Sequence, residues 1–522
     1  MSIRQRGGGR PQGLSERDKV DHRLHSLKVV RGESLGLHAE ALPRSFADAI
    51  GSAIAAELSS RNPKEPRLRW RADIDKSVAG RERLSERLCS KVSRGLCAPG
   101  STKEVAAARL VPAALRRGAR VPDSVGAVST AVDIAVVGRG LLGSAAARHL
   151  TELSAASTTV AIIGPREPTN RAAHDGVFGA HYDSGRITRV IDRDPFYARL
   201  NAASIARHRA LEARTGVTFY ERVGHLAVSP IADYLAALEQ RAVEHEISAE
   251  RIPGDELGSR FSALSFAGGC DAVFDPSGGW IDPRRFIEAQ NQALVLAGGF
   301  VIDDAVTDLV ATDNSVTLRT SDGSTVITHR VLLATGAFAN HLGVIPKEID
   351  FEVHEHTVVL GEVNEADATD LASMPSVIYK RGDAVGESVY VLPPIRYPDG
   401  RTYIKIGQST GKAIADPATE LIPWFQGDGD PAISAWLTNE LTALLPQVTF
   451  QTMHPQSCVT TKSPTGRQFI DRFGGGQVFA LLAGNGQVAK SADELGWIAA
   501  RRLLDGVVPQ PYHAEDFRLR HR

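Results

Sequence analysis

The pattern of apolar and polar positions predicts regular structure from about residue 131 onward. Residues 132–137 form a β-branched run, which is typical of a buried parallel strand. A glycine-containing turn follows, and then the segment "LLGSAAARHL", which predicts a helix with small residues facing the sheet. A second apolar run at 158–164 predicts the next strand. This order of strand, turn, helix and strand indicates an α/β unit.

Alternation of apolar and polar residues marks three later segments. They are "EVHEHTVVLGEV" at 352–363, "ESVYVLPPI" at 387–395 and "RTYIKIGQS" at 401–409. A period of two predicts strands that belong to a sheet with differing faces. Clusters of Pro, Gly and Asp between these segments, such as "RYPDGR" and "FQGDGDP", predict turns.

The first 128 residues have a different composition. Residues 1–126 carry 25 Lys and Arg against 14 Asp and Glu, a net charge of +11, and the remainder carries 35 against 47, a net charge of −12. Phe46 and Trp70 are the only aromatic residues of this segment. So few large apolar groups cannot offset the entropy of ordering the chain, so we expect a basic, mostly disordered extension over 1–128.

Three roles for this extension remain open. An organelle-targeting arm should be poor in acidic residues, which this segment is not. The basic residues are too diluted to match a nucleic-acid-binding motif, so nucleic acid is not an expected partner. An accessory extension upstream of the first domain is the preferred interpretation.

Composition also bears on location and metal binding. No apolar run approaches the roughly 20 residues of a membrane helix, and the start "MSIRQRGGGR" lacks the apolar core of a secretory signal. The four cysteines (Cys89, Cys97, Cys270 and Cys458) are too scattered for a disulfide framework or a zinc site. We therefore expect a cytoplasmic protein with no membrane contact and no metal.

A dinucleotide-binding motif follows the first predicted strand. Gly138, Gly140 and Gly143 have the G-x-G-x-x-G spacing between a strand and a helix, the context in which glycines let the backbone approach a pyrophosphate. The acid that normally ends the next strand and binds ribose is absent, because that position holds Gly164. Arg166 nearby is compatible with a 2′-phosphate, so the glycines alone leave FAD, NAD and NADP open.

The order of several further segments resembles the D-amino-acid-oxidase superfamily. They are "VVGRGLLG", "HYDSGRITR", "FYARLNAASIARHRALEARTG", "AVFDPSGGWIDPRRFIEA", "VLLATGAFAN", "RTYIKIGQS", "SCVTTKSPTGRQFIDRF" and "VFALLAGNGQVAKSADELG". Within that superfamily the similarity is to the branch of monomeric sarcosine oxidase and N-methyltryptophan oxidase. It extends over about residues 131–515.

The resemblance implies a fold class and a domain organisation. The fold would be α/β, with a Rossmann-like FAD-binding domain and a second α+β substrate domain built on an antiparallel sheet. The FAD domain would comprise 131–213, 276–345 and 455–515, and the substrate domain 214–275 and 346–454.

The resemblance also implies FAD as the cofactor and indicates residues that contact it. Besides the three glycines of the first turn, these are His181, Arg186, Gly336, Gly484 and Gly486. In the related branch, a cysteine a few residues before a Thr-Lys pair forms a thioether to the flavin. Cys458 stands in that register before Thr461 and Lys462, which predicts a covalent flavin. The alternative is a small buried apolar side chain.

Four side chains are implied for catalysis. Lys405 would lie over the flavin and promote oxygen reduction, as a fixed cation can. Arg189 and Lys490 would bind the substrate carboxylate, and Arg186 would lie nearer the flavin. Lys490 stands two positions beyond the usual place of the related lysine, which Val488 occupies. The alternatives are a lysine on a solvated strand face for Lys405 and a surface lysine for Lys490.

The predicted function is that of an FAD-dependent oxidase acting on CH–NH or CH–NH₂ donors. Its substrate would be an N-alkyl or cyclic amino acid, oxidised to an imine, and its second substrate would be oxygen, reduced to hydrogen peroxide. Thr460 and Ser409 stand where the related branch has a tyrosine and a histidine, so the pocket differs. Two alternatives remain: a dehydrogenase of the same fold that passes electrons to a carrier or quinone, and a non-catalytic flavin-binding subunit.

Overall fold

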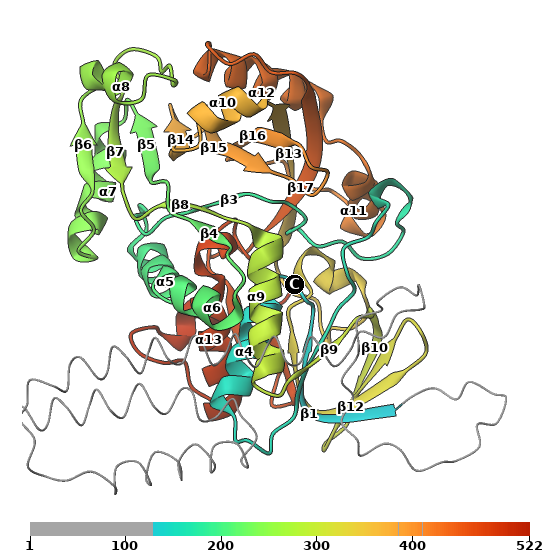
Figure 1. Cartoon of the computed structure of the whole chain (residues 1–522). Helices are drawn as coiled ribbons and strands as arrows, with labels where there is room; N and C mark the ends of the chain where they lie inside the picture. Colours follow the sequence, from blue (N-terminus) through green and yellow to red (C-terminus); the bar gives the residue numbers. More distant parts are fainter. Residues whose placement is uncertain (1–128, 385, 410) are drawn as a thin grey trace, which may run out of the picture. The chain divides into compact units, whose positions relative to one another are not determined.

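The computed structural model describes residues 129–384, 386–409 and 411–522, and the extension expected over 1–128 lies outside them. Two eight-stranded sheets and a small three-stranded sheet organise this part of the chain (Figure 1). The described helices are α4 (Leu141–Leu153), α5 (Pro195–Ile205), α6 (His208–Thr215), α7 (Ala232–Glu244), α8 (Gly254–Arg260), α9 (Pro283–Leu296), α10 (Glu365–Asp370), α11 (Pro417–Gln426), α12 (Pro431–Leu444) and α13 (Val488–Asp505). Short 3₁₀ turns are η2 (Arg171–Ala173), η3 (Gly336–His341) and η4 (Ala514–Phe517).

The first sheet is built around the strand predicted from the first apolar run. Its strands are β1 (Ser129–Val137), β2 (Val160–Ile163), β9 (Phe300–Ile302), β10 (Val306–Ala311), β11 (Val316–Thr320), β12 (Thr325–Leu333), β18 (Phe469–Arg472) and β19 (Val478–Leu482). Their order is β10-β11-β12-β1-β2-β9, with β19 also on β12 and β18 on β19. The central pairs β12-β1, β1-β2 and β2-β9 are parallel, as the predicted α/β unit requires.

Both faces of this sheet are buried, which explains why β1 reads as a continuous apolar run. Ala135 and Val137 point into one apolar cluster, and Ile134 and Val136 into another. The second cluster includes side chains of α4 and α13, which pack against each other over the sheet (Figure 1). The N-termini of these two helices therefore come to the same edge of the sheet.

The second sheet contains all three segments predicted from alternation. Its strands are β5 (His225–Ser229), β6 (Glu250–Ile252), β7 (Asp271–Asp275), β13 (Glu352–Glu362), β14 (Ser376–Lys380), β15 (Ser388–Arg396), β16 (Thr402–Gln408) and β17 (Met453–Lys462). The order is β17-β13-β16-β15-β14-β5-β7-β6, and the pairs are antiparallel except for β14-β5. The predicted fold class is confirmed. The exact domain boundaries stay a prediction, and β17 pairs within the second sheet.

A three-stranded sheet connects the two large ones in sequence. It has the order β3-β8-β4 and consists of β3 (Arg186–Thr188), β4 (Tyr220–Glu221) and β8 (Gly279–Ile281). Because β3 carries Arg186 and leads directly to Arg189, this small sheet fixes the segment that holds both arginines.

Four helices begin with the same local signal. Asp194, Asp282, Asp416 and Asp430 each cap a helix through the side chain, and proline occupies the first helical position after each. The carboxylate accepts a hydrogen bond from an otherwise unpaired N–H, and proline has the required φ and no N–H to satisfy. The Asp-Pro pairs thus set where α5, α9, α11 and α12 begin.

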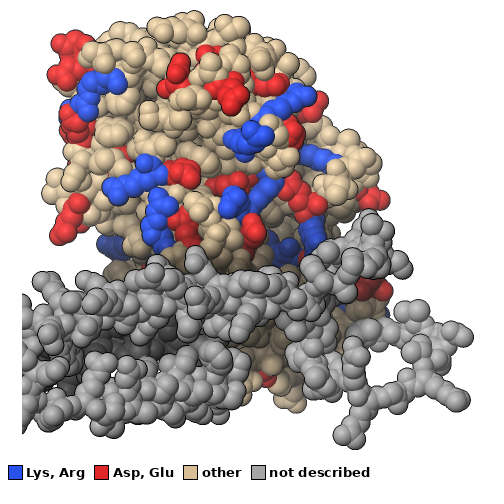
Figure 2. All heavy atoms as spheres, in the orientation of Figure 1, with Lys and Arg blue, Asp and Glu red and all other residues tan. Residues whose placement is uncertain are grey.

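The described surface mixes charges of both signs. On the face drawn in Figure 2, Lys and Arg side chains lie among Asp and Glu side chains rather than apart from them. Within the ranges that the structure describes, no helix combines the length and the apolarity needed to cross a membrane.

Candidate active site

The glycine turn after β1 forms one wall of a cavity of about 700 Å³. Gly138 has a φ of +107°, and a Cβ atom there would lie 2.3 Å from the carbonyl oxygen of Ala334. A Cβ on Gly143 would lie 1.8 Å from the carbonyl oxygen of Gly138. The backbone is thus so close that only glycine fits, and the first turn of α4 has no side-chain cap. Its free N–H groups suit a pyrophosphate, so the residues present fit a dinucleotide.

A second turn faces the same cavity from the other end of the chain. Gly336, Gly484 and Gly486 all line the cavity, and the last two lie between β19 and α13; their contact with the cofactor stays a prediction. The hydroxyl of Thr461 accepts a hydrogen bond from the N–H of Gly484 at 2.9 Å and fixes this turn. The buried hydroxyl of Thr335 has no hydrogen-bond partner among the described residues and also lines the cavity.

The acid expected to bind ribose is missing at the end of β2 because its side chain would have no room there. A Cβ on Gly164 would lie 2.7 Å from both the backbone N and the Cβ of Arg139, so the glycine turn leaves no room for a side chain there. The nearest acid in sequence, Glu167, pairs instead with Arg284 at 2.6 Å. Asp303, which follows β9, forms ion pairs with Arg139 and with Arg166.

His181 lies in the cavity wall beside the glycine turn. A Cβ on Gly140 would be 3.6 Å from its Nδ1 atom. Burial and the neighbouring Arg284 and Arg186 guanidinium groups lower the pKa of His181 to about 3. The ring is therefore neutral and can accept or donate one hydrogen bond, depending on its tautomer.

Arg186 belongs to a buried ionic cluster that includes Lys405. The Asp183 carboxylate accepts from both Arg186 and Lys405, and from the hydroxyl of Tyr397 at 2.8 Å. Lys405 Nζ also donates to the carbonyl of Gly185 at 2.9 Å. Burial and the Arg186 charge lower the pKa of Lys405, whereas the Asp183 carboxylate favours its ammonium form.

The positions of these two cations relative to the cavity differ. Arg186 lines the cavity, but Lys405 is 0 % exposed and is not among the side chains that line it. The strand alternation is as predicted, because Ile404 and Ile406 point into the apolar cluster on the other face of β16. The predicted location of Lys405 over the flavin stays a prediction.

Arg189 and Lys490 come together in the cavity although they lie on different elements. Both line it and are buried. Arg189 Nη2 is 3.2 Å from the carboxylate of Asp192, and Arg189 Nε has no partner among the described residues. Burial and the Arg189 charge lower the pKa of Lys490 to about 7, against the opposing effect of Asp192. His225 lies next to them and is neutral, because burial, Arg189 and Lys490 lower its pKa.

Cys458 lies on β17 where this strand passes the cavity. Its Sγ is 3.4 Å from Arg186 Nη2, and its carbonyl accepts from Trp424 Nε1 at 2.8 Å. Thr460, two residues on, also lines the cavity, and its hydroxyl is 2.9 Å from His356 Nε2. The Cys458 sulfur therefore lies in the cavity wall beside a guanidinium group.

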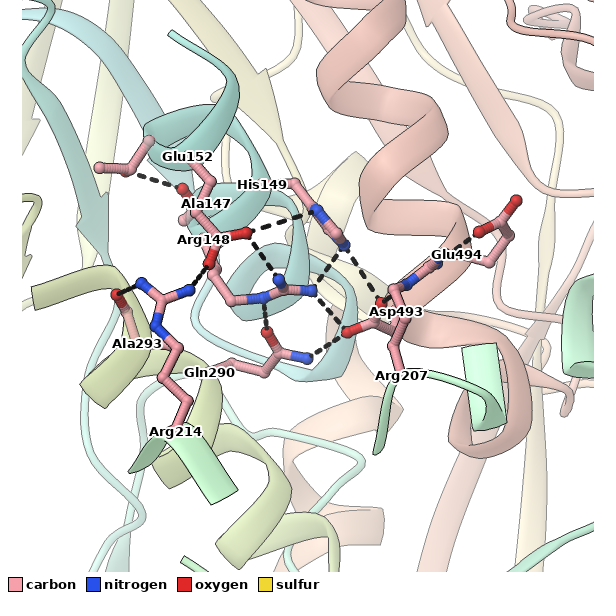
Figure 3. A network of polar contacts seen from close by, with 11 residues as sticks. Ala147, Arg148, His149, Glu152, Arg207, Arg214, Gln290, Ala293, Asp493 and Glu494 are labelled. Atoms are coloured by element: carbon pink, nitrogen blue, oxygen red, sulfur yellow. Dashed lines mark hydrogen bonds and ion pairs between the residues drawn. The ribbon is translucent and has the colours of Figure 1, made fainter. Parts of the chain in front are cut away.

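A buried polar network holds the two helices of the site together (Figure 3). The Asp493 carboxylate on α13 accepts from Arg148 of α4 at 2.7 Å, from Gln290 of α9 at 2.9 Å and from Arg207. His149 Nε2 lies 3.2 Å from the same carboxylate. Because α4 begins at the glycine turn and α13 begins beside Lys490, this network fixes the two helix N-termini that face the cavity.

Several side chains of the site were not predicted from the sequence. Asp192 is the one that the sequence could have indicated, since it follows Arg189 by three residues. Tyr234, Tyr390 and Lys380 also line the cavity but come from α7, β15 and β14, so only the topology brings them there. Within the described ranges, no group of three or more His, Cys, Asp or Glu residues is arranged to hold a metal ion.

Comparison with known proteins agrees with this site. The chain is 23 % identical over 351 residues to a monomeric sarcosine oxidase of Bacillus sp. (strain NS-129), an alignment that covers 66 % of this chain and 85 % of that one. Its fold resembles NikD, an amino acid oxidase of nikkomycin biosynthesis, with a TM-score of 0.60 and 18 % identity over 75 % of this chain and 98 % of that one.

L-proline dehydrogenase of P. horikoshii is similar with a TM-score of 0.57 and 17 % identity, over 75 % of this chain and 97 % of that one. Residues 133–502 match the family described as FAD dependent oxidoreductase (DAO). This match spans most of the chain and contains both glycine turns and every predicted site residue. The chain therefore belongs to the DAO family of FAD-dependent oxidoreductases.

Proposed function

We propose that the protein is an oxidase of an N-alkyl or cyclic amino acid, which oxidises the C–N bond to an imine and reduces oxygen to hydrogen peroxide. One observation carries the proposal: Arg189 and Lys490 are buried in the cavity beside the glycine turns, and Asp192 is the only acid that lines it within the described part of the chain. A buried excess of positive charge is costly unless an anion neutralises it. A substrate carboxylate would do so, and the relatives named sarcosine oxidase and amino acid oxidase support this choice.

FAD, when bound, accepts two electrons from the C–N bond and delivers them to oxygen. The chain's own residues position the amine. Arg189 offers a planar fork for the carboxylate, and Lys490 adds a point charge when it is protonated. With its carboxylate held in this way, the substrate presents the carbon and nitrogen of one bond to the cofactor in a fixed orientation.

Two further roles follow for residues near Arg186. Lys405 would provide a fixed positive charge where negative charge develops on oxygen, acting from behind the Asp183 carboxylate. Cys458 would form the thioether to the flavin, because its sulfur lines the cavity beside the Arg186 guanidinium.

A same-fold dehydrogenase is the second candidate, and the burial of Lys405 favours it. Asp183 offsets the charge of Lys405, and the ammonium does not reach the cavity surface, so its help to oxygen reduction would be weaker. The likeness to an L-proline dehydrogenase agrees with this alternative.

The test separates the two half-reactions. The purified protein is mixed anaerobically with N-methyl amino acids and with cyclic amino acids such as L-proline, and the absorbance of oxidised flavin is followed. Bleaching shows amine oxidation, and fast return of the absorbance with peroxide on adding air shows an oxidase. Bleaching followed by slow return supports the dehydrogenase. If no amino acid of either class bleaches the flavin, the proposed function is wrong.

A further inference from the structure

The second sheet contributes a group of polar side chains to the cavity wall, beside the apolar Val358 and Ile378. Ser388 and Ser409 line it at the adjoining ends of β15 and β16, and their hydroxyls are 3.0 Å apart. Gln408 also lines it, is 6 % exposed, and its Oε1 has no partner among the described residues. Lys380, at the end of β14, pairs in register with Ser388. These side chains are suited to a polar group of the substrate rather than to an alkyl group.

The charges along the cavity are strongly unequal. Among the described residues, seven basic side chains line it against one acidic side chain, Asp192; the basic ones are Arg139, Arg186, Arg189, Arg193, Lys380, Lys462 and Lys490. The cofactor brings a pyrophosphate, and the substrate carboxylate is assigned to Arg189 and Lys490. Arg139 pairs with Asp303 and Arg186 with Asp183. Lys380, Arg193 and Lys462 are assigned to neither ligand.

Lys380 lies beside Tyr234, and Arg193 is exposed. Lys380 Nζ is 5.8 Å from the centre of the Tyr234 ring and donates to the carbonyl of Gly382 at 3.0 Å. It also pairs with Asp383, whose side chain is 78 % exposed. Lys380 and, more weakly, Arg193 lower the pKa of the Asp383 carboxyl, which places both cations near one exposed acid.

An ion pair with so exposed a partner contributes little to stability. A substrate carboxylate inside the cavity can therefore bind the Lys380 ammonium beside Asp383 or in its place. The serine pair next to Lys380 can donate to the same carboxylate.

We propose that the preferred substrate is an N-substituted amino acid with a second carboxylate, an amino dicarboxylate. Its first carboxylate binds Arg189 and Lys490, and its second binds Lys380 with the hydroxyls of Ser388 and Ser409. This inference rests on the proposed function, because it names the substrate class of the same site.

The experiment measures ligand binding without turnover. The flavin-loaded protein is titrated with glutarate and with butyrate, a monocarboxylate of similar length, and the change in flavin absorbance gives each dissociation constant. Glutarate should bind about tenfold more tightly or better, which corresponds to one hydrogen bond to a charged group. In Lys380→Met this preference should disappear while butyrate binding is unchanged. In the control Lys347→Met, which removes an exposed lysine that does not line the cavity, both constants should stay as in the wild type.

Three results would overturn the inference: equal binding of the two ligands by the wild type, equal weakening of both in Lys380→Met, or a preference that high salt abolishes, which would indicate only long-range attraction. Turnover distinguishes this failure from failure of the proposed function. Oxidation of N-methylalanine at the same efficiency as N-methylglutamate would sustain the oxidase and refute the dicarboxylate preference. Tight glutarate binding without oxidation of any amino acid would sustain the subsite and refute the oxidase.

Discussion

The charge of Lys490 should make carboxylate binding depend on pH near neutrality. Burial and Arg189 lower the pKa of Lys490 to about 7, so the free protein holds the ammonium below that pH and loses it above. A bound carboxylate stabilises the ammonium by about 1.5–3 kcal/mol, the value for a hydrogen bond to a charged group. By linkage, the same free energy raises the pKa of Lys490 in the complex by roughly 1–2 units.

The dissociation constant of a simple carboxylate follows from these two pKa values. It should be constant below about pH 7. It should rise by up to about tenfold per pH unit above that, and level off about 10–150-fold higher once Lys490 is neutral in the complex as well. Propionate is a suitable ligand because it has no amine that titrates in this range, and flavin absorbance reports its binding. Lys490→Met should bind at the weak limit at every pH.

Arg189→Met provides the matched comparison. It should weaken propionate binding at all pH values by about 1.5–3 kcal/mol, because the fork is lost. It should also move the pH-dependent rise to higher pH, because the Arg189 charge that lowers the pKa of Lys490 is gone. A wild-type profile that is flat between about pH 6 and pH 9, or a Lys490→Met variant that keeps the wild-type profile, would refute the assignment of Lys490.

Three other substitutions test separate parts of the site. Lys405→Met should slow reoxidation of the reduced flavin by oxygen far more than its reduction by substrate, and stopped-flow measurement that finds equal slowing would indicate a structural role. Acid precipitation of the wild type should leave the flavin in the pellet, and Cys458→Ser should release it to the supernatant; release from the wild type would exclude a covalent bond. Asp493→Ala should lower the free energy of unfolding by about 3–5 kcal/mol near neutral pH, measured with denaturant, because it removes the buried carboxylate that the buried Arg148 and the half-buried Arg207 share.

The free energy of unfolding at low pH provides a second test of Asp493→Ala. Burial alone would raise the pKa of Asp493, but the hydrogen bond from His149 and the Arg148 charge hold it well below its ordinary value. A carboxyl with a depressed native pKa contributes stability above its unfolded-state pKa of about 3.9 and loses it as the pH falls toward the native pKa. The difference between wild type and variant should therefore shrink below about pH 4. A difference that stays the same at low pH would mean that a cavity, not the charge, causes the loss.

Local pattern was sufficient for the elements whose environment is simple. β1 is buried on both faces and reads as an apolar run, and β16 alternates as predicted. The glycines of the first turn were identifiable from their spacing, because close backbone approach at Gly138 and Gly143 and a positive φ at Gly138 restrict these positions, whereas the glycines of the second turn were indicated only by the family resemblance.

The contacts that decide the chemistry could not be predicted in this way. Lys405 pairs with Asp183, which is 222 residues away in sequence, and this partner places the ammonium behind Arg186. Lys380 lies in the cavity wall because β14 stands between β15 and β5 in the second sheet, and β5 comes from a segment about 150 residues earlier in the chain. Both facts depend on the order of strands in the second sheet, which alternation does not encode.

The absent ribose acid shows how one residue of the glycine turn can change a neighbouring strand. Arg139 is the second residue of the motif, and its backbone N and Cβ take the space that a Cβ at position 164 would need. β2 pairs in parallel with β9, so that Ile163 lies opposite Ile302. Asp303 follows directly after Ile302, the last residue of β9. The carboxylate thus stands one strand further along the sheet edge, where it pairs with Arg139. The glycine at 164 is therefore explained by the backbone position of Arg139, whereas the acid at 303 is the ion-pair partner of the Arg139 side chain.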